Sequence, residues 1–82
     1  MTLSEIKRAN AAAGHYFFEP DTLRFFRSRC SEQTYGRHFA TSEKGPNGIR
    51  AWSVRRCEGD GSIETVGEFQ GYPSLARALT AA

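Results

Sequence analysis

The sequence predicts a single small α+β domain over residues 1–82. It has an N-terminal helix, a short second helix, a three-stranded antiparallel meander and a C-terminal helix packed on one face of the sheet. We expect all the helices to lie on this same face. Helix caps with helical spacing of apolar residues mark both ends of the chain, and alternating apolar and polar residues mark its middle. At 82 residues the chain forms one domain with a small core.

The first helix is expected over residues 2–13. Thr2 and Glu5 stand in the Thr-x-x-Glu relation of a capping box, and Gly14 suits the left-handed residue that follows a helix. Leu3 and Ile6 begin a thin apolar stripe at helical spacing.

The second helix is expected to begin at Pro20, within a stretch of four phenylalanines and three arginines, FFEPDTLRFFRSR. Proline fits the first turn of a helix. In a helix, Leu23, Phe26 and Cys30 share one face and the arginines turn outward, whereas a strand would mix apolar and charged residues on each face. We therefore expect a helix with Phe26 in the core.

Three strands follow, over residues 35–43, 49–57 and 63–72. The GPNG segment at 45–48 is typical of a loop, and Asp60-Gly61 predicts a type I′ hairpin turn. Gly67 marks a candidate bulge in the last strand.

The last helix is expected over residues 74–82, with Ser74 as its N-cap and Leu75, Ala78 and Leu79 as its apolar stripe. We expect one core and an exposed Asp60-Gly61 turn. Phe26→Ala should then nearly unfold the domain. The expected core residues are Trp52, Val54, Ile63, Phe69, Phe26, Leu75 and Leu79.

Basic residues are concentrated in the middle of the chain. Residues 24–56 hold eight Lys or Arg and two Asp or Glu, while residues 57–82 hold one Arg and four acids. Arginine suits bidentate contacts with carboxylate or phosphate, so a cationic face predicts an anionic partner. The alternative is a solvated surface whose arginines pair with Glu19, Asp21, Glu32 and Glu43. The candidate contact residues are Arg24, Arg27, Arg29, Arg37, Arg55 and Arg56, with Trp52 or Tyr35 as aromatic anchors.

We predict no enzymatic activity, no cofactor and no metal. The sequence has no Gly-x-Ser-x-Gly, no phosphate-binding glycine loop and no His-Glu-x-x-His. Zinc ligands usually come in pairs a few residues apart, and Cys30, Cys57, His15 and His38 do not. The cysteines are expected to be free thiols.

No apolar run approaches the length of a membrane span, and the N-terminus lacks the pattern of a signal peptide. We expect a soluble, monomeric protein in the cytoplasm.

Most of the chain from Gly14 onward resembles a set of small uncharacterised proteins of phages and other mobile elements. The shared marks are the Phe-x-Pro-Asp-Thr-x-Arg-Phe-Phe-x-Ser-Arg segment, a Thr-Ser-Glu and a late Thr-Val-Gly-x-Phe-Gln. This resemblance implies a setting rich in inhibitors of host defence, including anti-CRISPR proteins, which act by occupying a surface of their target.

Residues 49–82 are also similar to the arm-type DNA-binding domain of phage integrases, in which a three-stranded sheet enters the major groove. Gly67, Phe69, Ser74 and Leu75 fall roughly in place. Glu64 and Glu68, on the outward face of the last strand, would repel phosphate.

These observations favour a small phage-type binding protein in the host cytoplasm, which inhibits a host defence complex of the CRISPR-Cas type by contact. The alternative is a DNA-binding or regulatory module, with nucleic acid as its partner.

Overall fold

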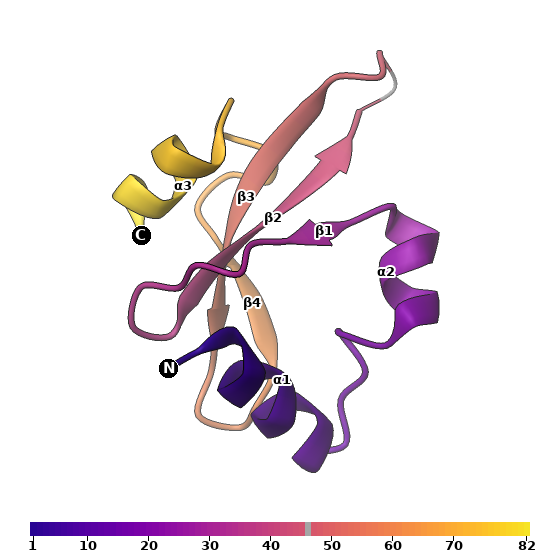
Figure 1. Ribbon diagram of the computed structural model, residues 1–82, viewed down its shortest axis with the longest axis vertical. Coiled ribbons are helices and arrows are strands. Elements are labelled where there is room, and N and C mark those ends of the chain that lie inside the picture. The colour runs from indigo at the N-terminus through magenta and orange to yellow at the C-terminus, as the bar shows by residue number, and fades with distance from the viewer. Residues whose placement is uncertain (46) are drawn as a thin grey trace.

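The computed structural model describes residues 1–45 and 47–82, which form three helices and a four-stranded antiparallel sheet (Figure 1). The strands lie in the order β1-β2-β3-β4, so each pairs with its neighbour along the chain. The α+β class is confirmed, and the expected three-stranded sheet is wrong by one strand. The elements are α1 (Leu3–Ala12), α2 (Pro20–Phe26), β1 (Arg29–Cys30), β2 (His38–Lys44), β3 (Arg50–Cys57), β4 (Ile63–Val66) and α3 (Leu75–Ala81).

The caps of the first and last helices are confirmed. The Thr2 side chain accepts a hydrogen bond from the Glu5 backbone N–H, and the Glu5 carboxylate accepts one from the Thr2 N–H, which completes a capping box at the start of α1. Gly14 follows α1 with φ of 85°. The Ser74 hydroxyl accepts a hydrogen bond from the Arg77 N–H at the start of α3.

The second helix is shorter than the sequence predicts. It begins with Pro20 as expected and ends at Phe26, because Arg27 adopts the left-handed conformation with φ of 52°. This reversal turns the chain into β1, where Cys30 pairs with Thr41 of β2. The expected helical face of Leu23, Phe26 and Cys30 is therefore wrong, and β1 is the strand that the sequence did not predict.

The hairpin between β3 and β4 is confirmed, but its turn is not of type I′. The Gly61 N–H donates to the Glu58 carbonyl and the Glu58 N–H donates to the Ser62 carbonyl, so three residues form the loop. Of these, Gly61 has positive φ, at 81°, and Asp60 does not. Three-residue hairpin loops usually have this arrangement. Gly61 is also buried under α1, contrary to the exposed turn that was expected.

The last strand is shorter than expected. β4 ends at Val66, and Gly67, with φ of 75°, turns the chain out of the sheet. The chain returns at Tyr72, whose backbone N–H and C=O pair with those of Trp52. The loop between β2 and β3 contains Pro46, which lies outside the described residues.

The helices α1 and α3 cover opposite faces of the sheet, so the expectation that all helices share one face is wrong. Ile6 of α1 packs with Phe39 of β2, whereas Ala78 of α3 packs with the next residue of that strand, Ala40. Successive residues of a strand point to opposite faces. The core therefore consists of two thin layers, one on each side of the sheet.

The composition of these layers corrects the predicted core. Phe26 and Phe69 are 61% and 54% exposed. Their place is taken by Phe39, which is fully buried and against which Phe17 and Phe18 stack with ring centroids 6.1 and 5.4 Å away. The other expected members are confirmed in the two layers: Val54, Trp52, Ile63, Leu75 and Leu79.

Among the described residues, we find no helix with the length and apolarity that crossing a membrane requires.

The two phenylalanines Phe39 and Phe26 should differ sharply in their contribution to stability. Phe39→Ala removes a fully buried ring and should lower the free energy of unfolding by about 3–5 kcal/mol. Phe26→Ala removes a largely exposed ring and should cost less than about 1 kcal/mol. Thermal unfolding of both variants measures the difference. A Phe26→Ala protein as unstable as Phe39→Ala would instead support the longer helix that the sequence predicted.

The packing of α1 on the hairpin should make Gly61 intolerant of any side chain. A Cβ at Gly61 would lie 2.7 Å from the Ala9 carbonyl oxygen, whereas a Cβ at Gly14, with similar φ, would meet no atom within 4 Å. Gly14→Ala should cost about 1–2 kcal/mol for the left-handed backbone alone. Gly61→Ala should cost about 1–3 kcal/mol more, because α1 must shift. Urea unfolding measures both, and an equal loss in the two variants would mean that α1 does not dock here.

Candidate functional site

Five basic side chains gather at one end of the sheet, around α2. Together with Leu23 and Ser28 they line a shallow hollow of about 380 Å³, which we call the basic hollow. The basic residues are Arg24, Arg27, Arg29, Lys44 and Arg50.

The fold brings these residues together from four elements. Arg24 lies on α2, and the left-handed turn at Arg27 reverses the chain so that Arg29 begins β1. Lys44 ends β2 and is paired with Arg50, the first residue of β3. The Arg50 guanidinium also donates to the carbonyl and hydroxyl oxygens of Ser42, both at 3.0 Å, which fixes it over the strand.

Little negative charge balances the basic hollow. Within the described parts of the chain, its one ion pair joins Arg24 to Asp21 at 3.5 Å, with side chains 78% and 95% exposed. An ion pair this exposed is worth only about 0–1 kcal/mol. For the arginines of the basic hollow, the expected alternative of pairing with local acids therefore has one weak pair in its favour. Arg55 and Arg56 do have acidic partners, Glu43 and Glu58.

Two aromatic rings stand beside the basic hollow. Phe25 is 80% exposed and Phe26 61% exposed, and the two rings meet edge to face with centroids 5.0 Å apart. A pair of exposed phenylalanines next to clustered arginines is the composition of a contact surface, since aromatic residues and Arg are enriched in interfaces. Sequence reasoning missed this pair because it placed Phe26 in the core.

The remaining candidate residues lie elsewhere. Arg37 donates to the backbone carbonyls of Cys57 and Glu58, at the other end of β2 and β3. Arg56 pairs with Glu58 at 2.7 Å. Trp52 is half-buried against α3, and Tyr35 is 67% exposed in the segment before β2. Of the predicted contact residues, the basic hollow thus unites Arg24, Arg27 and Arg29.

Lys44 and Arg50 were not among the candidates, although the sequence held a signal for them. They flank the loop at 45–48, so antiparallel pairing of the strands on either side places them opposite one another. Like charges directly opposite on two strands repel and are unfavourable for folding. This pairing therefore adds two positive charges to the same end of the sheet.

Arg55 has a different environment from the other candidates. Its guanidinium donates to the hydroxyls of Thr41 at 2.9 Å and Thr65 at 2.7 Å, and it pairs with the Glu43 carboxylate at 3.3 Å. The two charged side chains are 14% and 7% exposed. Arg55 is thus used mainly within the fold, where it joins β3 to both neighbouring strands.

Two aromatic rings flank the Arg55 guanidinium. It lies 5.6 Å from the ring centroid of Phe17 and 5.5 Å from that of Phe69, which are distances of cation–π contacts. The buried charge of Arg55 is therefore compensated by one carboxylate, two hydroxyls and two ring faces.

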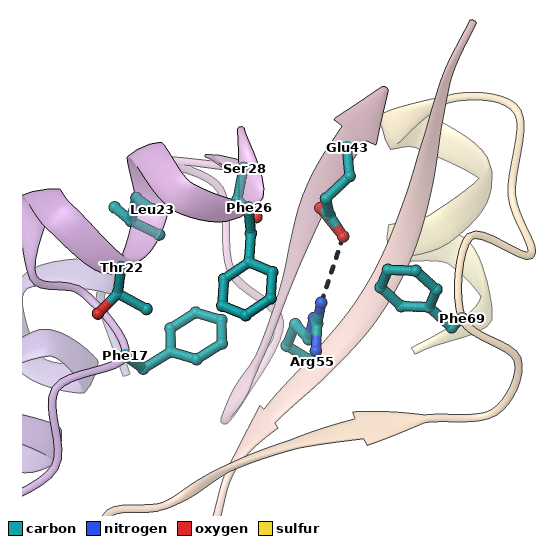
Figure 2. A pocket seen from close by; sticks show the side chains of 8 residues that line it. All are labelled: Phe17, Thr22, Leu23, Phe26, Ser28, Glu43, Arg55 and Phe69. Carbon is teal, nitrogen blue, oxygen red and sulfur yellow. Dashed lines mark hydrogen bonds and ion pairs between the residues drawn. The ribbon is translucent and has the colours of Figure 1, made fainter. Parts of the chain in front are cut away.

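A second hollow lies between α2 and the sheet, with Arg55 and Glu43 between its walls (Figure 2). It has a volume of about 250 Å³, and we call it the aromatic pocket. Phe17 and Phe26 stand on the α2 side and Phe69 stands across from them. Leu23 and Ser28 line both this pocket and the basic hollow, so the two are neighbours. The full lining is Phe17, Thr22, Leu23, Phe26, Ser28, Glu43, Arg55 and Phe69.

The ionisable groups show no cluster of the kind that holds a metal. In residues 1–45 and 47–82, no three His, Cys, Asp or Glu side chains come together. Both cysteines are free, and burial raises the pKa of the Cys30 thiol. Cys30 is therefore protonated at neutral pH, which is the unreactive form.

The Arg55–Glu43 pair should be far more important for folding than the exposed pair on the same strand. Arg55→Ala leaves the Glu43 carboxylate buried without a counter-charge and should cost about 3–5 kcal/mol. Arg56→Ala breaks a pair whose side chains are 44% and 33% exposed and should cost less than about 1 kcal/mol. The double variant Arg55→Met/Glu43→Leu should recover part of the loss, because it removes both buried charges. Chemical unfolding tests all three, and equal stability of the two single variants would contradict the role of Arg55.

No curated protein matches the chain, and no solved structure does. One family matches over residues 2–82, nearly the whole chain, and its description is "Family of unknown function (DUF7447)". The chain therefore belongs to this family, DUF7447.

Proposed function

We propose that the protein is a non-enzymatic binding protein that acts by occupying a surface of its partner. The contact surface is the basic hollow together with the exposed rings of Phe25 and Phe26. The target is a host defence complex of the CRISPR-Cas type in the host cytoplasm, which is the setting that the resemblance to small phage proteins implies.

One observation carries the proposal. Five cationic side chains converge around α2 while the described part of the chain offers them a single, highly exposed counter-ion. Such a cluster opposes folding through repulsion, so an anionic partner that relieves the repulsion gains binding energy. The partner therefore carries carboxylates or phosphates at the contact. A CRISPR-type complex offers both, on its acidic protein patches and on its bound RNA.

The exposed phenylalanines give this surface an apolar centre. Binding hot spots combine aromatic side chains with arginine, and the aromatic side chain loses little conformational freedom on binding. Phe25 and Phe26 are adjacent to the cationic side chains in sequence and on α2. Charge would steer the encounter, and the rings would provide the dry contact that holds the complex.

The alternative, a DNA-binding module, has less in its favour. An integrase-like mode needs one face of the sheet free to enter a major groove. Here α3 covers one face, and α1 with Phe17 and Phe18 covers much of the other. A basic surface can still hold nucleic acid at its edge, so the two functions must be separated by experiment.

Charge reversal of the arginines in the basic hollow should abolish partner binding and leave the fold intact. We expect the triple variant Arg24→Glu, Arg27→Glu and Arg29→Glu to unfold within a few degrees of the parent, because all three side chains are exposed. Capture of the partner from host lysate and inhibition of a CRISPR-type defence should both be lost.

The matched control is the triple variant Lys7→Glu, Arg8→Glu and Arg77→Glu. It changes the net charge by the same amount as the triple variant of the basic hollow. Its three side chains lie on α1 and α3 and are also exposed, so it should retain capture and inhibition. Capture is repeated after nuclease treatment of the lysate. Because the proposed target carries RNA, partner loss after treatment with DNase alone would favour the DNA-binding module. Full inhibition by the hollow triple variant would place the active surface elsewhere.

A further inference from the structure

The aromatic pocket contains an acceptor atom that the fold leaves unused. The Oε2 of Glu43 is the one buried side-chain nitrogen or oxygen atom of the described residues that lacks a hydrogen-bond partner. Its side chain is 7% exposed, and its other oxygen is occupied by Arg55. Figure 2 shows this free oxygen on the side of Glu43 that faces Phe26 and Ser28. Buried polar atoms are nearly always paired in native proteins, so an unpaired one in a pocket indicates a missing donor.

The pocket favours a flat, neutral donor over a cation. Arg55 already neutralises Glu43, and the basic hollow next to it makes the surroundings positive. A second cation would be repelled there. Phe17 and Phe69 already contact the guanidinium of Arg55, and the ring of Phe26, which is 61% exposed, offers a face on which another ring can stack. The group that satisfies these conditions is a planar ring with an N–H at its edge.

The adjoining hollow provides for a negative charge on the same ligand. Leu23 and Ser28 line both cavities, so a molecule whose ring enters the aromatic pocket can place an attached anion among the arginines. Arginine and lysine are the side chains that bind phosphate most often. A ring with an N–H edge, joined by a short linker to a phosphate, is a nucleotide.

We propose that the aromatic pocket binds the base of a nucleoside phosphate and that the basic hollow binds its phosphate. The free oxygen of Glu43 accepts a hydrogen bond from the exocyclic amino group of the base. The base stacks against Phe26, which lies at the exposed rim of the pocket. Base stacking on aromatic side chains and on arginine planes is the usual way in which proteins hold an unpaired base.

The size of the pocket and the chemistry of Glu43 restrict the base. A volume of about 250 Å³ accommodates one ring system and not an extended chain of bases. Adenine, cytosine and guanine each carry an amino group that can donate to a carboxylate. Uracil presents its N–H between two carbonyl oxygens, which a carboxylate oxygen repels. UMP should therefore bind most weakly of the four nucleotides.

This proposal deepens the proposed function and rests on it for the phosphate site, because both use the basic hollow. The nucleotide has two sources with the same chemistry, a free nucleotide or an unpaired position of a single-stranded RNA. A free ligand would bind equally well without further phosphates. An RNA would gain affinity from its neighbouring phosphates and lose it steeply as salt increases.

The test is calorimetric titration of the purified full chain with AMP, CMP, GMP, UMP and inorganic phosphate, and with a short single-stranded RNA. We expect the three amino-bearing nucleotides to bind with Kd below about 1 mM and to bind more tightly than UMP and phosphate. Phe26→Ala should weaken binding by about 5- to 150-fold, the effect of losing one stacked ring. Tyr16→Ala is the control. Its ring is 72% exposed, compared with 61% for Phe26, and it lines neither the aromatic pocket nor the basic hollow, so binding should be unchanged.

A second variant examines the acceptor. Glu43→Gln keeps the shape of the side chain and replaces one oxygen by a donor, so the preference over UMP should disappear. Should this variant fail to fold, the Phe26→Ala and Tyr16→Ala pair still decides the question. Three results would each overturn the proposal: no detectable binding of any nucleotide at about 1 mM, equal binding of UMP and AMP, or equal effects of the Phe26→Ala and Tyr16→Ala variants. Partner capture from nuclease-treated lysate would persist if the nucleotide proposal alone were wrong.

Discussion

The Arg55 guanidinium is the group on which the arrangement of the sheet depends. It lies on β3 and binds Thr41 and Glu43 of β2 on one side and Thr65 of β4 on the other. A shift of register by one residue would turn Arg55 to the other face of the sheet, where its neighbour Val54 packs in the layer of α3. A buried charge without its partner is strongly unfavourable. The pairing of three strands is therefore specified by charge as much as by apolar contact.

The same network explains why the domain has an open side. The sheet face under α1 has an apolar half around Phe39 and a polar half around Arg55 and Glu43. The polar half does not attract an apolar helix, and the helix nearest to it, α2, has seven residues and none that is buried. The aromatic pocket is what remains between α2 and this polar half (Figure 2). The composition of one strand pair thus creates the hollow next to the basic residues.

Local signals predicted α1, α3 and the β3–β4 hairpin, because caps and turns depend on a few adjacent residues. The end of α2 had no such signal, since Arg27 adopts a conformation that glycine usually supplies. Arg24, Arg27 and Arg29 are close together in the sequence, so their gathering at one site could be predicted. The burial of Arg55 could not. In a strand, side chains alternate between the two faces, so Arg55 was expected on the other face from Val54 and Trp52 and therefore exposed. Only the cross-strand register shows that this face also carries Glu43, Thr41 and Thr65.

Several features that oppose folding lie together around α2. Arg27 has a left-handed backbone, Lys44 and Arg50 are like charges in direct register, and the Oε2 of Glu43 is buried without a donor. Two phenylalanines are exposed in the same region. A domain of 82 residues has a small free energy of unfolding, so selection is expected to remove unfavourable features that arise by chance anywhere in the fold. Their concentration in one region is expected where a partner supplies what the fold lacks, namely negative charge, a hydrogen-bond donor and an apolar surface. One ligand can meet all three deficits, which is why we propose that the basic hollow and the aromatic pocket form a single binding surface.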